Sequence, residues 1–84
     1  PTPSINVLSK NHKIYPNPAS NVLNIISKQA DQIKLFDSFG RKVTQRNLNQ
    51  ELVSLNIKNL SSGLYFYELS NNNQTISNGK IIFE

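Results

Sequence analysis

The segment LSSGLYFYELS, residues 60–70, decides the fold class of this chain. Leu60, Gly63 and Tyr65 have the spacing of a tyrosine corner, in which a Tyr near the start of a late strand turns its hydroxyl back to upstream backbone. Gly63 stands where the backbone must turn tightly. From Tyr65 to Leu69 every second residue is large and apolar, which is the period of a half-buried strand. The segment therefore predicts a β-strand that opens at a sharp turn.

Similar segments lie on both sides of it. Alternating residues predict strands over 14–15, 22–26, 32–37, 41–46 and 53–57, with Val43 as the one core residue of a charge-protected edge strand over 41–46. Residues 75–83 predict a closing strand, which Asn78-Gly79 interrupts by a bulge or a break. Together with 63–69 these make about seven strands. We therefore predict an all-β, immunoglobulin-like antiparallel β-sandwich.

Turn chemistry separates the predicted strands. Pro16-Asn17-Pro18 fixes two φ angles and lacks two N–H donors, so it predicts a rigid turn after Tyr15. Asp37-Ser38-Phe39-Gly40 predicts a tight turn, with the Asp carboxylate accepting backbone N–H groups and Gly supplying a positive φ. Asn71-Asn72-Asn73 predicts the turn before the last strand.

Length and composition indicate one small domain. The 84 residues include no cysteine, so the core must hold without disulfides. Residues 1–12 are rich in Pro, Ser and Asn and predict a linker with room for a single adherent strand, and the domain proper covers 13–84. No apolar run approaches the ~20 residues of a transmembrane helix. Because the chain starts at Pro1, we expect any export signal to lie upstream.

The residues that could carry catalysis are few and scattered. The one histidine, His12, falls in the predicted linker and is expected to be solvated. The acidic residues do not form a metal-binding loop, and the three glycines are too far apart to cradle a phosphate. We therefore expect no enzyme activity, no metal and no cofactor.

The surface chemistry leaves two binding functions to weigh. The formal charge of +4 comes from dispersed lysines and arginines without a stacking motif, so nucleic acid is not an expected partner. A carbohydrate-binding or adhesion β-sandwich is the alternative function, because such modules stack sugars on exposed aromatics. The chain has no tryptophan, and its seven tyrosines and phenylalanines are expected mostly to fill or flank the core.

The motifs taken in order resemble one family. The set comprises Tyr15-Pro16-Asn17-Pro18, Asp37 with Gly40-Arg41, Leu60 with Gly63 and Tyr65, and the terminal segment Lys80-Ile81-Ile82-Phe83-Glu84. It resembles the type A C-terminal sorting domain of the type IX secretion system of Bacteroidetes, from about Lys13 to Glu84. Asn78-Gly79 and the acidic Glu84 depart from the pattern of many members.

The resemblance implies a secretion signal rather than a catalyst. It implies that the domain follows an exported cargo into the periplasm and is recognised there by the outer-membrane translocon and its shuttle protein, with recognition at Lys80 to Glu84. It further implies a cargo that ends at the cell surface or outside the cell. A sortase-like protease would cleave in or before the linker, a tether expected to be accessible.

Overall fold

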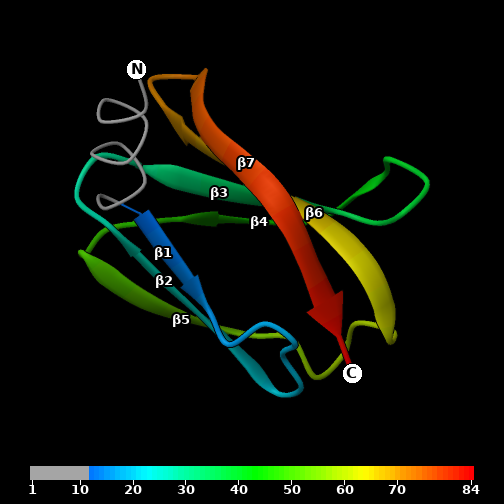
Figure 1. Cartoon of the computed structure of the whole chain (residues 1–84). Helices are drawn as coiled ribbons and strands as arrows, with labels where there is room; N and C mark the ends of the chain where they lie inside the picture. The colour runs from blue at the N-terminus through cyan, green and yellow to red at the C-terminus, as the bar shows by residue number, and fades with distance from the viewer. Residues whose placement is uncertain (1–11) are drawn as a thin grey trace, which may run out of the picture.

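The computed structural model describes residues 12–84, which form seven β-strands and no helix (Figure 1). The strands are β1 (His12–Tyr15), β2 (Val22–Ser27), β3 (Gln32–Phe36), β4 (Lys42–Asn47), β5 (Leu52–Asn56), β6 (Gly63–Asn71) and β7 (Gln74–Phe83). This confirms the predicted all-β class and strand number for the described residues. None of these residues belongs to a helix long and apolar enough to cross a membrane.

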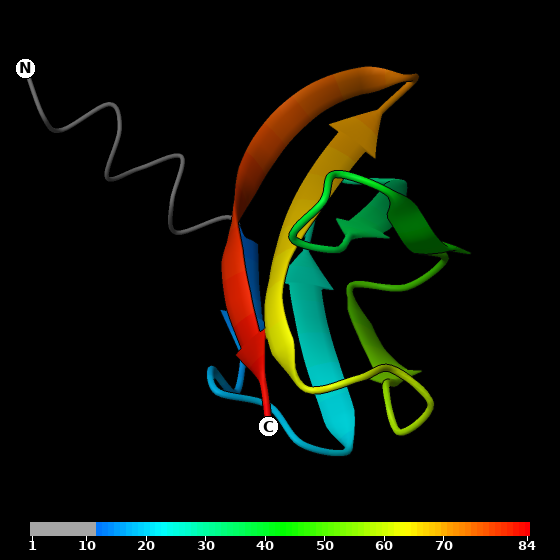
Figure 2. The ribbon, with the colours of Figure 1, turned by 90° about the vertical axis from the view of Figure 1, so that its right-hand side faces the viewer.

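The strands form two antiparallel sheets. One sheet has the order β1-β2-β5 and the other the order β4-β3-β6-β7, which is the layering of an immunoglobulin-like sandwich. β4 lies at an edge, as its charged sequence predicts. β6 and β7 form a long curved hairpin, drawn in yellow and orange to red in Figure 2. Its two-residue turn, Asn72-Asn73, has φ angles of 51° and 67°, which asparagine tolerates better than most residues.

The core lies between the sheets and is built from alternate positions of the strands. Leu23 and Ile25 of β2 face Ile33 and Leu35 of β3, and all four are at most 1% exposed. The other buried hydrophobic residues are Ala19, Ala30, Leu48, Leu55, Ile57, Tyr65, Leu69, Ile81 and Phe83. Most of these positions continue the alternation of a strand, whereas Ala19, Ala30 and Leu48 lie in the segments between strands.

The prediction that Val43 enters the core is wrong. Leu35 pairs with Thr44 and Phe36 with Lys42, so Val43 is an extra residue without a partner in β3. Such a bulge changes the alternation of side chains along the strand. Thr44 is therefore half-buried, whereas Val43 is 37% exposed.

The predicted interruption of the last strand at Asn78-Gly79 is also wrong. β7 runs without a break from Gln74 to Phe83, and its irregularity lies earlier, where Ile76 is the extra residue opposite Leu69 and Ser70. Gly79 pairs with Tyr67, and a Cβ at this position would lie 2.7 Å from the Tyr67 ring. The glycine therefore makes room for an aromatic ring on the neighbouring strand.

The first strand includes one residue of the predicted linker. β1 begins at His12, and the His12 imidazole, which we expected to be solvated, is half-buried with Nδ1 2.9 Å from the hydroxyl of Ser27. The Ser27 hydroxyl also accepts hydrogen bonds from the backbone N–H groups of Gln29 and Ala30, at 3.2 and 2.9 Å. His12 therefore belongs to the folded domain. The rest of the predicted linker lies outside the described residues.

Candidate recognition site at the C-terminal strand

The tyrosine corner, residues Leu60 to Tyr65, fixes the start of β6 against the end of β7. The Tyr65 hydroxyl donates a hydrogen bond of 2.7 Å to the carbonyl of Ser61, which is the predicted corner contact. Gly63 has a φ of +142°, a conformation that is essentially restricted to glycine. The Tyr65 ring stacks on Phe83 with 4.4 Å between ring centroids and an interplanar angle of 27°. The corner therefore holds the C-terminal strand from the inner side.

The opening turn, residues 16–19, holds the same strand along its outer edge. Asn17 accepts a hydrogen bond from the Ile82 N–H at its Oδ1, at 3.0 Å, and its Nδ2 donates to the Lys80 carbonyl at 3.4 Å. Ala19 then donates its N–H to the Ile82 carbonyl and accepts the Glu84 N–H, both at 2.8 Å. In Figure 1 the loop after β1 (blue) accordingly passes beside the end of β7 (red).

These four bonds occupy the outward backbone groups of the terminal segment, Lys80 to Glu84. The Lys80 carbonyl, the Ile82 N–H and carbonyl and the Glu84 N–H all have partners in the opening turn. On the other side, residues 79–83 pair with β6. An edge strand normally offers free backbone groups to an added strand. Here that edge is closed, so a partner that meets the folded terminal segment must read its side chains.

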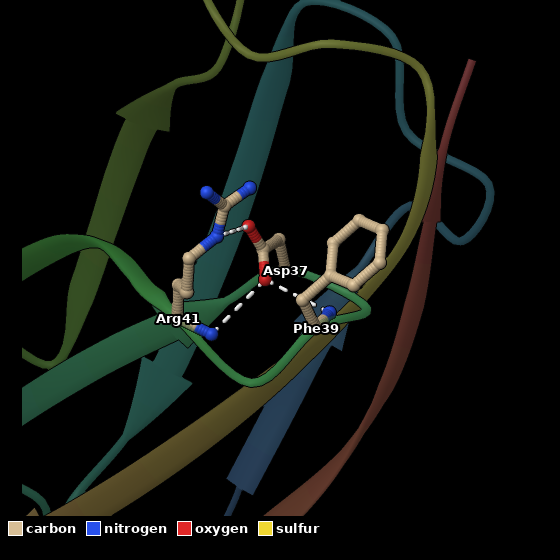
Figure 3. A network of polar contacts seen from close by, with 3 residues as sticks. All are labelled: Asp37, Phe39 and Arg41. Carbon is tan, nitrogen blue, oxygen red and sulfur yellow. Dashed lines mark hydrogen bonds and ion pairs between the residues drawn. The ribbon is translucent and has the colours of Figure 1, made fainter.

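The central turn, Asp37 to Arg41, is organised by one carboxylate (Figure 3). Asp37 Oδ1 accepts the backbone N–H groups of Phe39 and Arg41 at 2.9 and 3.0 Å, and Oδ2 accepts the Arg41 Nε–H at 2.9 Å. Gly40 has a φ of 84° and donates its N–H to the Asp37 carbonyl. The hydrogen bond from the Arg41 backbone N–H is the main reason that the pKa of Asp37 lies below its ordinary value of 3.8. The Phe39 backbone N–H and the Arg41 side chain lower this pKa further, against an opposing effect of burial that is smaller than that of the main hydrogen bond.

The opening turn and the tyrosine corner both contact the terminal segment, and the central turn adjoins the corner. The central turn and the tyrosine corner line one hollow, which includes Phe39, Arg41, Ser62 and Tyr65. The opening turn and the corner both contact the last residues of β7. Segments that are up to 65 residues apart in the sequence thus join around the C-terminus. Residues 80–84 are therefore held in place by contacts from two other segments of the chain.

The sequence matches a known protein family. The model of the family described as secretion system C-terminal sorting domain matches residues 13–84. The chain belongs to this family. The resemblance drawn from the ordered motifs is thereby confirmed, and so is the sorting function that it implied.

Solved structures extend the comparison to the fold of this sorting domain. PorZ, an essential bacterial surface component of the type IX secretion system of Porphyromonas gingivalis, contains a similar structure, with a TM-score of 0.73 and 20% identity. The match covers 89% of the sorting domain and 12% of the PorZ chain, so the sorting domain spans about an eighth of that protein. At this identity the likeness shows the fold. No curated protein sequence matches significantly.

The structure separates the five residues predicted for recognition into two groups. Ile81 and Phe83 are 1% and 2% exposed and belong to the core of the sorting domain. Lys80, Ile82 and Glu84 are exposed, and Ile82 shows 43% of its surface. The alternation of strand side chains explains this division. A partner of the folded sorting domain can therefore contact only the second group.

The other predicted motif residues have structural contacts. Tyr15 is half-buried in β1 beneath Lys13, whose Nζ lies 5.5 Å from the ring centroid, and Leu60 packs against the core. Ala19 was not among the predicted residues, yet it is fully buried, and both its N–H and its carbonyl form hydrogen bonds with the terminal segment. A small residue directly after Pro16-Asn17-Pro18 is a signal for close backbone approach, and it could have identified this contact.

The described residues hold no group of three or more His, Cys, Asp or Glu side chains that could bind a metal ion. The large exposed aromatic among residues 12–84 is Phe39, at 83%, and it lies 5.5 Å from the Arg41 guanidinium. A single exposed ring is a small platform for a sugar. The family match decides between the two functions that the sequence left open, in favour of sorting.

Proposed function

We propose that this sorting domain directs its cargo through a type IX secretion system, with the exposed side chains of Lys80, Ile82 and Glu84 as part of the signal. The partners are the outer-membrane translocon and its shuttle protein, which meet the folded domain in the periplasm. The cargo then reaches the cell surface or the medium. Family membership over residues 13–84 supports the sorting role.

One observation carries the residue-level proposal. The opening turn and the tyrosine corner hold the terminal segment on both sides, although Lys80, Ile82 and Glu84 themselves stay exposed. Fixing the segment this firmly gives a partner a preorganised surface, which lowers the entropic cost of binding.

The test is a fusion of residues 1–84 to a reporter protein that is exported to the periplasm. In a bacterium with a type IX secretion system we expect the reporter at the surface or in the medium. Retention in the periplasm, with the domain folded, would show that the proposal is wrong. The same fusion in a strain without the translocon is the control.

Lys80→Ala tests the signal separately from stability. Lys80 is exposed and forms no salt bridge within residues 12–84, so the substitution should change the free energy of unfolding by no more than about 0.5 kcal/mol. We expect the variant to keep its melting temperature and to be secreted poorly. Lys58→Ala, at another exposed lysine, is the matched control. Normal secretion of the Lys80 variant would remove Lys80 from the signal.

We further propose that a sortase-like protease removes the domain after transport by cleaving in or before residues 1–12. Mass spectrometry of the secreted reporter tests this step. A reporter that still carries residues 13–84 after secretion would rule it out for this cargo.

A further inference from the structure

The outer face of the four-stranded sheet carries a row of side chains that crosses all four strands. Phe36 of β3 pairs with Phe66 of β6 and with Lys42 of β4, and Phe66 pairs with Lys80 of β7. Directly paired residues of antiparallel strands share a face. The outer row therefore has the order Lys42, Phe36, Phe66, Lys80, with one lysine at each end and two aromatic rings between them.

The bulge at Val43 is what brings Lys42 into the outer row. Lys42 donates a hydrogen bond of 2.7 Å to Oε1 of Gln45, and Gln45 pairs with Lys34 on the same face. Residues three apart would face opposite sides of a regular strand. The extra residue between them places both on the outer face.

The middle of the outer row is apolar and hollowed. Phe36 and Phe66 are half-buried and line a surface hollow together with Glu68, Asn78 and Lys80. The next cross-strand pair is Leu64 with Ile82, and Ile82 is 43% exposed. No described element of the chain covers this face, because the two sheets contact each other through their inner faces.

The charges around the hollow favour an acidic partner. Lys34 and Glu68 form a weak ion pair with 4.0 Å between Nζ and Oε1. Within residues 12–84 neither Lys42 nor Lys80 lies within salt-bridge distance of a carboxylate. The outer face is thus apolar at its centre and cationic at both ends. A second copy of the chain on this face would bring lysines toward lysines, which disfavours self-association.

We propose that the outer row binds an extended acidic segment of a partner protein, in which an apolar side chain lies over Phe36 and Phe66 and two carboxylates meet Lys42 and Lys80. This inference rests on the proposed function, because Lys80 belongs to both surfaces. It adds the chemistry of the partner and a residue, Lys42, that lies 38 positions away from the terminal segment.

The dimensions of the sheet define the segment. Neighbouring strands lie about 4.8 Å apart, so the row from β4 to β7 spans about 14 Å between its end strands. An extended chain rises about 3.3 Å per residue, and side chains four positions apart lie on one face about 13 Å apart. A five-residue segment therefore fits the outer row when its first and fifth residues are acidic and its third is apolar, as in Glu-Thr-Leu-Thr-Glu.

The binding experiment uses the chain and a synthetic peptide with this pattern, followed by nuclear magnetic resonance of the ¹⁵N-labelled chain. We expect saturable shifts at Lys42, Phe36, Phe66 and Lys80. Exposed ion pairs are worth up to about 1 kcal/mol, so Lys42→Glu should weaken binding about fivefold, and added salt should weaken it further. Lys58→Glu, an exposed charge reversal outside the outer row, should leave the affinity unchanged.

Several results would overturn the inference. One is that a peptide with Lys in place of both Glu residues binds with the same affinity, and another is that the peptide shifts only resonances on other faces. The inference would also fail if the chain self-associated through this face, or if it bound anionic phospholipid vesicles and did not bind the peptide. Melting temperatures of the variants confirm that each one is folded.

The secretion assay separates the two proposals. If the wild-type fusion is secreted and the Lys42→Glu fusion is not, with Lys58→Glu secreted normally, both proposals are supported. If Lys42→Glu is secreted like the wild type, the outer row is not a recognition surface, and the proposed function stands. If the wild type is retained in the periplasm, the proposed function fails, whatever the peptide does.

Discussion

Replacing Asn17 by alanine removes the side-chain bridge between the opening turn and the outer edge of β7. The bridge consists of one hydrogen bond of 3.0 Å from the Ile82 N–H and a longer one of 3.4 Å to the Lys80 carbonyl. A neutral hydrogen bond contributes about 0.5 to 1.5 kcal/mol, and water can replace the lost partners at this exposed position. We expect Asn17→Ala to lower the free energy of unfolding by about 1 kcal/mol. For a domain of this size that corresponds to about 6 °C in melting temperature.

Native-state hydrogen exchange gives the sharper readout for Asn17→Ala. The Ile82 amide should exchange faster than in the wild type, by more than the global destabilisation explains, because its acceptor is gone. The Tyr67 amide, in the middle of β6, should follow only the global change. Asn59→Ala is the matched control, since the Asn59 side chain is exposed and has no hydrogen bond within the described residues. An Ile82 amide that exchanges at the wild-type rate would show that the Asn17 side chain does not protect the outer edge of β7.

Three further substitutions test the turns and the hairpin. Gly79→Ala should cost about 1 to 3 kcal/mol in urea denaturation, because its Cβ would lie 2.7 Å from the Tyr67 ring, and a Tyr67→Leu background should relieve most of that cost. Gly63→Val should destabilise the domain more than Asn72→Ala. The φ of +142° at Gly63 excludes β-branched residues, whereas the φ of 51° at Asn72 is only unfavourable for alanine. Equal urea midpoints of the two variants would contradict this prediction. Asp37→Asn should lower the melting temperature at pH 7. Because folding lowers the pKa of Asp37, its ionised carboxylate stabilises the folded state at pH values above the ordinary pKa of 3.8. The difference in melting temperature between wild type and Asp37→Asn should therefore shrink as the pH falls below that value.

The turns and the strand faces could be predicted from sequence because each depends on local chemistry. The corner at Gly63 and Tyr65 needs a glycine conformation and one hydroxyl contact four residues upstream. The central turn needs one carboxylate and one glycine within five residues. The family resemblance followed from the order of these local signals, and the family match confirmed it.

The bulges and the contacts between distant segments could not be predicted, because they depend on which strands pair. A shift of one residue in register reverses every side chain beyond it, and the alternation within β4 alone does not show where β3 imposes the shift. In the same way Asn78-Gly79 carries a turn signal, yet the ring of Tyr67 on the partner strand explains the glycine. The bridge from Asn17 to Ile82 joins positions 65 apart, beyond the reach of any local pattern.

The terminal segment contains buried and exposed residues, and experiments on the proposed signal must test the two groups separately. Ile81 and Phe83 hold the strand to the core, so their removal unfolds the domain and abolishes any function that needs it. The side chains of Lys80, Ile82 and Glu84 face outward, and the backbone of this segment is bonded to the opening turn, so we expect substitutions there to leave the fold intact. A deletion of residues 80–84 removes both groups together, so it cannot distinguish loss of the recognition signal from loss of the fold. Substitutions at the outward positions, combined with Lys42→Glu on the far side of the same face, make that distinction.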